Sequence, residues 1–141
     1  MTDVFTKEKP SEIMSRIRSK NTEAEKIVFS FLRKNKIYFQ KHYKRIPGSP
    51  DIASPRKKKA VFIDGDFWHG RDFERVKKNR DADDYWVKKI GDNIERDKKQ
   101  RAAIKEEGWA VLKIWESNLK RKSSRAEQLE KIKNFLTGAM E

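Results

Sequence analysis

Two short runs of strand-forming residues, joined by a compact basic connection, restrict the fold of this chain more than any other feature. The apolar run Ala60–Ile63 is typical of a buried strand, and Asp51–Ala53 forms a second short strand that leaves the turn Pro47–Pro50. The basic segment Pro55–Lys59 joins the two. Because so short a connection joins antiparallel strands, we expect a hairpin, with the start of one strand beside the end of the other.

Helical patterns surround this predicted hairpin. Thr22 and Glu25 form a capping box that begins an amphipathic helix, and Gly108 is placed to end a long helix over 84–107. Inward-facing residues recur at helical spacing in three helices: Ala24, Ile27, Val28, Phe31 and Leu32 in the first, Val87, Ile90, Ile94 and Ile104 in the long one, and Leu129, Ile132, Phe135 and Leu136 in the last.

The remaining segments complete the order of elements. β-prone residues at 37–43 precede the turn, a central strand is expected at 109–115, and 65–83 is expected to be an irregular loop. Residues 1–20 form either a basic arm or a short helix. The order helix, three strands, helix, strand, helix predicts an α/β fold, with a mixed central β-sheet flanked by α-helices on both faces.

Length and composition narrow the class of protein. The 141 residues suit a single domain over 1–141, and the net charge of +13 favours nucleic acid as a partner. The absence of cysteine excludes disulfides and thiolate zinc sites and suits a reducing compartment. No apolar run approaches the roughly 20 residues of a membrane span, and the first residues lack a signal-peptide pattern, so we expect a cytoplasmic protein without a membrane partner.

Three aspartates surround the predicted hairpin. Asp51 opens one strand, Asp64 closes the next, and Asp66 lies just beyond, so the hairpin can bring their carboxylates together. Mg²⁺ prefers such hard oxygen ligands. His69 follows in the same segment, and its intrinsic pKa of about 6.5 suits it to move a proton during phosphodiester hydrolysis.

Each candidate also has a purely structural explanation. An aspartate after Pro50 is a common turn former, helix capping explains Glu25 as well as function does, and His42 is expected to be an ordinary strand residue. The aromatic residues Phe67, Trp68 and Trp86 either pack in the core or stack on nucleic-acid bases.

Five segments in order resemble the very-short-patch-repair (Vsr) endonuclease family. The resemblance covers nearly the whole chain and implies a restriction-endonuclease-like core, Mg²⁺ with Mn²⁺ as a substitute, and nicking of one strand of duplex DNA beside a T:G mismatch left by deamination of 5-methylcytosine. The segments are MSRIRSKNT (14–22), PGSPD (47–51), VFIDGDFWH (61–69), YWVKKIGDN (85–93) and GWAVLKIWE (108–116).

The resemblance also implies roles for individual residues. The position of Asp51 holds the central metal ligand, and the backbone carbonyl of Ile63 supports the metal. The position of His69 is catalytic and acts with hydrated metal, while Glu25 assists the site. Three aromatic residues match those inserted into DNA (Phe67, Trp68 and Trp86), and three further residues match positions near the mismatched pair (Met14, Lys89 and Asn93).

Two departures from the family pattern stand out. Asp66 and Ser117 occupy positions where zinc-binding cysteines are expected, so no structural zinc is predicted, and the loop must be held by packing or by ion pairs through Arg71, Asp72 and Arg75. Asp64 stands where the family can have a histidine, and it is either a direct metal ligand or the residue that orients a metal-bound water.

Three functions agree with the sequence. The leading one is the mismatch-nicking enzyme. Its alternatives are a restriction or junction-cleaving endonuclease on the same core and a DNA-binding module without catalysis. Double-stranded DNA, T:G mismatched in the leading interpretation, is the expected partner. A monomer suffices to nick one strand, and contact with mismatch-repair proteins is left open.

Overall fold

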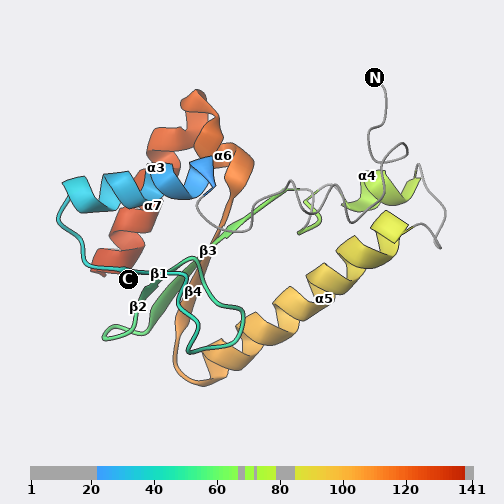
Figure 1. The fold of residues 1–141 in the computed structure, drawn as a ribbon, viewed down its shortest axis with the longest axis horizontal. Helices are drawn as coiled ribbons and strands as arrows, with labels where there is room; N and C mark the ends of the chain where they lie inside the picture. The colour runs from blue at the N-terminus through green and yellow to red at the C-terminus, as the bar shows by residue number, and fades with distance from the viewer. Residues whose placement is uncertain (1–21, 67–68, 72, 79–84, 139–141) are drawn as a thin grey trace.

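A computed structural model describes residues 22–66, 69–71, 73–78 and 85–138, and Figure 1 shows their arrangement. The expected arm at 1–20, with Met14, lies outside this part of the chain, as do Phe67, Trp68 and Asp72. The elements are α3 (Glu23–Lys34), β1 (Gln40–Lys41), β2 (Ile52–Ser54), β3 (Lys59–Asp64), α4 (Phe73–Lys78), α5 (Tyr85–Glu106), β4 (Ala110–Trp115), α6 (Glu116–Lys120) and α7 (Lys122–Thr137).

The four strands form one mixed sheet in the order β1-β2-β3-β4. The pairs β1–β2 and β2–β3 are antiparallel, whereas β3 and β4 are parallel and are connected through α4 and α5. Helices α3, α6 and α7 lie on one side of this sheet and α5 on the other (Figure 1). The predicted α/β class, with a mixed sheet flanked by helices, is therefore confirmed.

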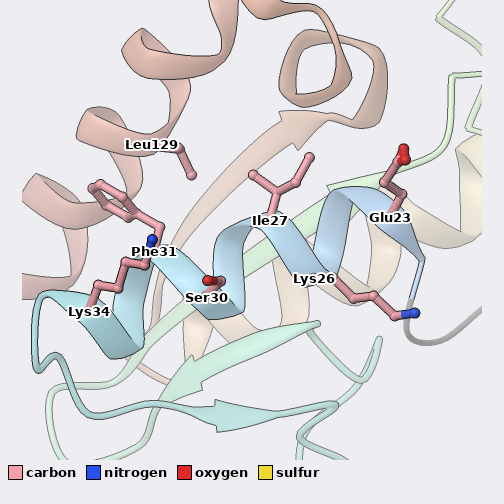
Figure 2. A pocket seen from close by; sticks show the side chains of 7 residues that line it. All are labelled: Glu23, Lys26, Ile27, Ser30, Phe31, Lys34 and Leu129. Atoms are coloured by element: carbon pink, nitrogen blue, oxygen red, sulfur yellow. The ribbon is translucent and has the colours of Figure 1, made fainter.

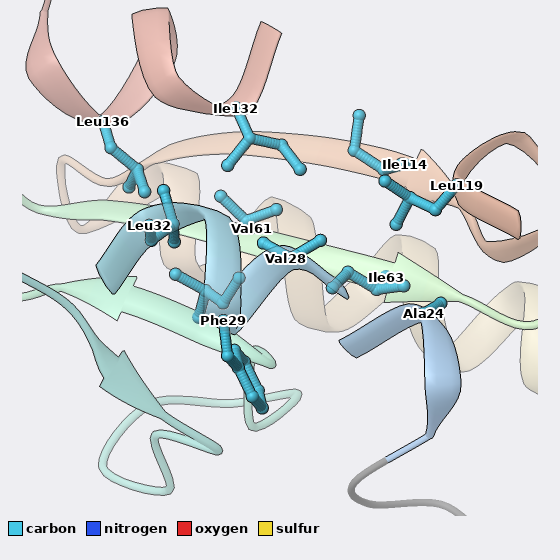
Figure 3. Packing of buried hydrophobic residues seen from close by; sticks show 11 residues of the cluster. Ala24, Val28, Phe29, Leu32, Val61, Ile63, Ile114, Leu119, Ile132 and Leu136 are labelled. Atoms are coloured by element: carbon cyan, nitrogen blue, oxygen red, sulfur yellow. The ribbon is translucent and has the colours of Figure 1, made fainter. Parts of the chain in front are cut away.

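The period-two alternation of β3 divides the buried residues between two cores. Val61 and Ile63 point to the cluster under α3, α6 and α7, where Val28, Leu32 and Ile132 also pack (Figure 3). Ala60 and Phe62 point to the opposite cluster, which includes Ile104 of α5 and Trp109. Successive side chains of a strand face opposite sides of the sheet, so β3 forms the centre of both cores.

The capping box predicted for the first helix is present. The backbone N–H of Glu25 donates to the Thr22 hydroxyl at 3.2 Å, and the N–H of Thr22 donates to Glu25 Oε1 at 3.4 Å. The second contact is longer than an ordinary N–H···O bond of about 2.9–3.0 Å. Capping therefore uses the Glu25 side chain only weakly, and the same carboxylate also contacts His42.

The basic hairpin connection ties down two helix ends. Lys57 and Lys59 donate to the carbonyls of Leu136 and Phe135, at the end of α7, over 3.1 and 2.7 Å. Lys58 donates to the carbonyl of Glu107, just beyond α5, over 3.2 Å. Lysines at helix C-termini satisfy unpaired carbonyls and interact favourably with the helix dipole.

Several expected boundaries differ from those observed. The strand expected at 37–43 is reduced to Gln40–Lys41, and His42, which follows it directly, adopts a positive φ angle of 48°. The strand at 110–115 lies at the end of the described sheet and not in its centre. The loop at 65–83 contains α4, and α6 precedes the last helix. Within the described ranges, no helix is long and apolar enough to cross a membrane.

Candidate active site

Asp51 lies where the pairing of β2 with β3 ends. The last paired position is Ile52 opposite Val61. Beyond it, Asp51 Oδ2 accepts a hydrogen bond from the backbone N–H of Ile63 at 2.7 Å, in place of a backbone carbonyl. The sequence places Asp51 there because Pro50 ends the preceding turn and the strand begins directly afterwards.

Glu25, His42 and Asp51 gather into one group beside α3. Each offers a ligand atom, and these atoms lie within 4.8 Å of one another, so the group can hold a metal ion. Glu25 is 2% exposed, and its Oε1 lies 3.0 Å from Nε2 of His42. The backbone N–H of His42 donates to the carbonyl oxygen of Asp51 at 2.9 Å, which extends the β1–β2 pairing by one residue.

The electrostatics of this group favour a bound cation. Burial raises the pKa of Asp51 to about 9, and its hydrogen bond with Glu25 and the negative charges of Glu25 and Asp64 act in the same direction, whereas the Ile63 N–H opposes them. Without a metal, the Asp51 carboxyl therefore holds a proton at neutral pH. A divalent ion would replace this proton and allow both carboxylates to be charged.

Asp64 belongs to a second group, on the α5 side of the sheet. Its two carboxylate oxygens accept from the two terminal nitrogens of Arg101, each at 2.8 Å. Arg101 also lies over the ring of Phe62, with its guanidinium carbon 4.2 Å from the ring centre. Asp64 is 3% exposed, so this bidentate pair neutralises a buried charge.

His69 completes the second group together with Asp97 of α5. Nδ1 of His69 lies 2.5 Å from Oδ2 of Asp97 and 3.8 Å from Oδ1 of Asp64, and ligand atoms of the three residues lie within 4.8 Å of one another. Burial acts to raise the pKa of Asp97, but the hydrogen bond and charge of His69, with Arg101 and Arg96, outweigh it and lower that pKa.

Gly70 is what allows His69 to approach α5 so closely. Its φ is +74°, and a Cβ atom there would lie 2.4 Å from Cδ1 of Ile94. The turn therefore packs its backbone directly on α5, one turn before Asp97 in that helix, and a glycine is required for both reasons.

Asp66 is held apart from both groups. Its carboxylate accepts from the Ser117 backbone N–H at 3.0 Å and from the Ser117 hydroxyl at 2.6 Å. Arg71 donates to Asp66 at 3.1 Å and to Ser117 at 2.8 Å. We call Asp66, Arg71 and Ser117 the clasp. It joins the loop after β3 to the start of α6, at the two positions where the family can carry cysteines.

The clasp bears on two earlier expectations. Burial acts to raise the pKa of Asp66, but the Ser117 and Arg71 hydrogen bonds outweigh it and hold that pKa below its usual value. The predicted role of Arg71 in holding the loop is therefore observed, while Asp72 and the side chain of Arg75 lie outside the described parts. The three aspartates do not form one cluster, since Asp51, Asp64 and Asp66 each enter a different set of contacts.

The residues matched to DNA contacts are placed differently from one another. Lys89 is partly exposed, whereas Trp86 and Asn93 are 3% and 6% exposed. A base could reach Trp86 or Asn93 only after the chain that covers them rearranges. Tyr85, beside Trp86, is 44% exposed, and its ring meets that of Trp86 edge to face.

Three residues of the two groups escaped the sequence interpretation. His42 was expected to be an ordinary strand residue, and neither Asp97 nor Arg101 was considered. A signal for the last two exists, because Asn93, Asp97 and Arg101 recur at four-residue spacing and so line one face of α5. No local pattern indicates His42, whose importance follows from the turn that brings residue 42 beside residue 51.

A shallow hollow also lies between α3 and α7 (Figure 2). Its lining shares no residue with either group, and we assign it no part in catalysis. The lining residues are Glu23, Lys26, Ile27, Ser30, Phe31, Lys34 and Leu129.

Comparisons with known proteins identify the family to which the chain is similar. The family model described as DNA mismatch endonuclease Vsr matches residues 2–75. Type II nicking enzyme V.XorIIP of Xanthomonas oryzae pv. oryzae is 39% identical over 119 residues, covering 84% of this chain and 88% of that protein. Type II nicking enzyme V.NmeAIP of Neisseria meningitidis serogroup A is 37% identical over 132 residues, covering 94% of each. DNA mismatch endonuclease Vsr of Escherichia coli K12 is 29% identical over 140 residues, covering 98% of this chain and 90% of that protein.

The mixed sheet, the carboxylate groups at its strand ends and these relatives define a DNA endonuclease. The alternative of a DNA-binding module without catalysis is thereby set aside. More narrowly, the chain belongs to the DNA mismatch endonuclease Vsr family, which confirms the resemblance carried by the five sequence segments and the restriction-endonuclease-like core that it implied.

Proposed function

We propose that this protein nicks one strand of duplex DNA beside a T:G mismatch and requires Mg²⁺ to do so. The observation that carries the proposal is that the buried Glu25 and the partly buried Asp51 offer carboxylate oxygens within 4.8 Å of each other and of His42, at a place where burial and the neighbouring Glu25 raise the pKa of Asp51. This pair of carboxylates and the second group, which contains His69, occur in a member of the Vsr family. Together they support metal-assisted hydrolysis of a phosphodiester.

Asp51 and Glu25 would hold the ion, with the backbone carbonyl of Ile63 as a further oxygen ligand. The N–H of Ile63 faces Asp51, and in an extended strand the C=O of the same residue points to the same side. Mg²⁺ would supply a water of lowered pKa and would stabilise charge on the phosphate. Asp64 is less suited to be a ligand, because Arg101 already occupies both of its oxygens.

His69 would transfer a proton during hydrolysis. Its Nδ1 is engaged with Asp97 at 2.5 Å. When Nδ1–H donates to this carboxylate, Nε2 is left to exchange a proton with the attacking water or the leaving oxygen. Asp97 would thus fix the tautomer and orientation of the ring, while Arg101 would neutralise the neighbouring Asp64.

Mismatch recognition is proposed for the residues carried over from the family. Met14, Lys89 and Asn93 would lie near the mismatched pair, and Phe67, Trp68 and Trp86 would insert into the DNA beside it. Phe67→Ala or Trp68→Ala should then weaken the preference for mismatched DNA more than the general affinity. An equal loss of affinity for paired DNA would remove this role.

The second candidate is nicking of fully paired DNA. Two of the relatives above are named type II nicking enzymes, and these names specify no mismatch. The same catalytic groups would serve this reaction, because substrate choice lies in the DNA contacts and not in the hydrolytic chemistry.

Incubation of end-labelled duplexes with Mg²⁺, read on a denaturing gel, tests the proposal. We expect nicking of a T:G duplex, slower cleavage of the fully paired and branched duplexes, and no cleavage in EDTA. Asp51→Ala should abolish nicking while DNA binding is retained. Nicking by Asp51→Ala at the wild-type rate would defeat the catalytic assignment, and equal cutting of all three duplexes would defeat mismatch specificity.

A further inference from the structure

His42 has three contacts beside the buried Glu25 and the partly buried Asp51. Its backbone N–H donates to the Asp51 carbonyl at 2.9 Å, its Nε2 lies 3.0 Å from Glu25 Oε1, and its ring meets the edge of Phe29 at 5.9 Å between centres. One residue therefore connects the backbone of Asp51 with the side chain of Glu25.

The backbone at His42 is adapted to this position. Its φ is 48°, in the left-handed region that non-glycine residues seldom adopt. Such a conformation persists only where surrounding contacts impose it, and it is concentrated at functional sites. Here it ends β1 and brings the imidazole to the carboxylate of α3.

The Glu25 carboxylate has contacts with Thr22, His42 and Asp51. Its capping contact with Thr22 is long, at 3.4 Å, and cannot fix the carboxylate firmly. The contact with His42 is shorter by 0.4 Å (3.4 − 3.0) and joins the same oxygen, Oε1. His42 therefore constrains Oε1 more tightly than Thr22 does, on a carboxylate that also forms a hydrogen bond with Asp51.

We propose that His42 is a positioning residue of the metal site: its Nε2–H holds the Glu25 carboxylate turned toward Asp51, so that the two carboxylates form a ready ligand pair. The inference rests on the proposed function and adds a residue to it. Partners that hydrogen-bond to metal ligands typically contribute about 10- to 100-fold in metal affinity or activity.

Two substitutions distinguish the effect of the hydrogen bond with Glu25 from the effect of the backbone conformation at residue 42. H42Q keeps an N–H donor at nearly the distance of Nε2, whereas H42N tolerates the left-handed backbone but is too short to reach Glu25. Should H42N fail to fold, H42G replaces it, because glycine adopts positive φ without cost. Thermal unfolding in EDTA checks that each variant is folded before metal is added.

The direct measurement is the binding of Mn²⁺ to the metal-free protein. The electron paramagnetic resonance signal of the free Mn²⁺ reports how much of the ion is bound. We expect H42N to weaken binding about 10- to 100-fold and H42Q to remain within a few-fold of wild type. The Mg²⁺ concentration for half-maximal nicking should rise in parallel, while affinity for duplex DNA in EDTA stays unchanged.

Two results would overturn the inference: wild-type Mn²⁺ affinity in H42N, or equal weakening in H42N and H42Q, since the hydrogen bond would then not be what matters. Asp51→Ala is the reference variant that distinguishes a failure of the proposed metal site from a failure of the proposed role of His42. If Asp51→Ala binds Mn²⁺ as wild type does, the proposed metal site itself is wrong. If Asp51→Ala loses Mn²⁺ affinity but the His42 variants bind Mn²⁺ as wild type does, the proposed metal site is supported and the proposed role of His42 is wrong.

Discussion

Asp51 lowers the free energy of unfolding of the metal-free protein at neutral and higher pH. Its carboxyl lies partly buried beside Glu25, and its desolvation together with this neighbour raises its pKa to about 9. A group whose folded pKa lies above its unfolded value of 3.8 binds its proton more tightly in the folded state. The folded state therefore loses stability as the pH rises from about 4 toward 9, because only the unfolded state has released the proton.

Asp51→Asn should consequently stabilise the metal-free protein. Asn can accept from Ile63 N–H and donate to Glu25, and it carries no titrating group. We expect a gain of about 1–2 kcal/mol in the free energy of unfolding in EDTA at pH 8, and a smaller gain at pH 5. Urea unfolding at both pH values measures this, and a gain that shrinks with rising pH would contradict the assignment.

Arg101 is the counter-charge on which the buried Asp64 depends. The pair has two 2.8 Å contacts, and the side chains are 15% and 4% exposed. Removal of one partner of a buried pair leaves an uncompensated charge, which is more destabilising than removal of both.

Arg101→Met should therefore lower the free energy of unfolding by about 3 kcal/mol at neutral pH. The double variant Arg101→Met with Asp64→Asn should recover part of this loss, because no charge is then stranded. Denaturant titration of the two variants and wild type gives the comparison. A loss below about 1 kcal/mol in the single variant, as for an exposed pair, would show that water solvates Asp64.

At the scale of elements, the turn after His69 is where β3 and α5 are coupled. Gly70 lies against Ile94 with a positive φ, and the adjacent His69 contacts Asp97 of the same helix. The geometry of the group formed by Asp64, His69 and Asp97 therefore depends on how closely this turn approaches α5.

Gly70→Ala should disturb both the fold and the reaction. The added Cβ would lie 2.4 Å from Ile94, so the turn must move, and we expect a loss of about 1–3 kcal/mol. A displacement of about 1 Å at His69 would slow single-turnover nicking on the order of 100-fold. Gly65→Ala is the matched control, because no atom lies within 4 Å of its added Cβ. Equal rates for the two variants would rule out this coupling.

At the scale of the whole molecule, the net charge of +13 is larger than the number of cationic side chains that are placed to contact DNA would suggest, because some lysines bind other parts of the chain. Lys57, Lys58 and Lys59 are directed to the ends of α5 and α7. Lys89, by contrast, is partly exposed at the start of α5, and we expect it to meet a phosphate.

Salt dependence should distinguish the two kinds of lysine. Lys89→Gln should reduce the slope of log Kd against log salt by about 1, whereas Lys59→Gln should leave that slope unchanged and lower the free energy of unfolding by about 0.3–1 kcal/mol. Fluorescence anisotropy with labelled duplex in EDTA, at several salt concentrations, provides the measurement. A reduced slope for Lys59→Gln would place the hairpin connection on the DNA.

Much of this architecture is readable from the sequence because local chemistry determines it. The Thr22–Glu25 capping box, the hairpin around Pro55–Lys59 and the end of α5 at Gly108 all follow from short-range patterns. The position of Asp51 at a strand end follows in the same way. The class of enzyme follows from several such segments in a fixed order.

The partners of the site residues depend on tertiary packing and are not readable in this way. Whether Asp64 faces a metal or Arg101 depends on which side of β3 it occupies and on which turn of α5 lies opposite. His42 depends on a left-handed residue that no propensity indicates. The sequence therefore predicts the ligand types at this centre better than it predicts which of them meet.

The clasp of Asp66, Arg71 and Ser117 is closed through oxygen and nitrogen atoms alone. Hydrogen peroxide and thiol-alkylating reagents therefore have no target in it, and it needs no metal ion to close. We expect that a chelator can empty the proposed metal site, and that other divalent ions can then be loaded one after another, while the clasp stays closed.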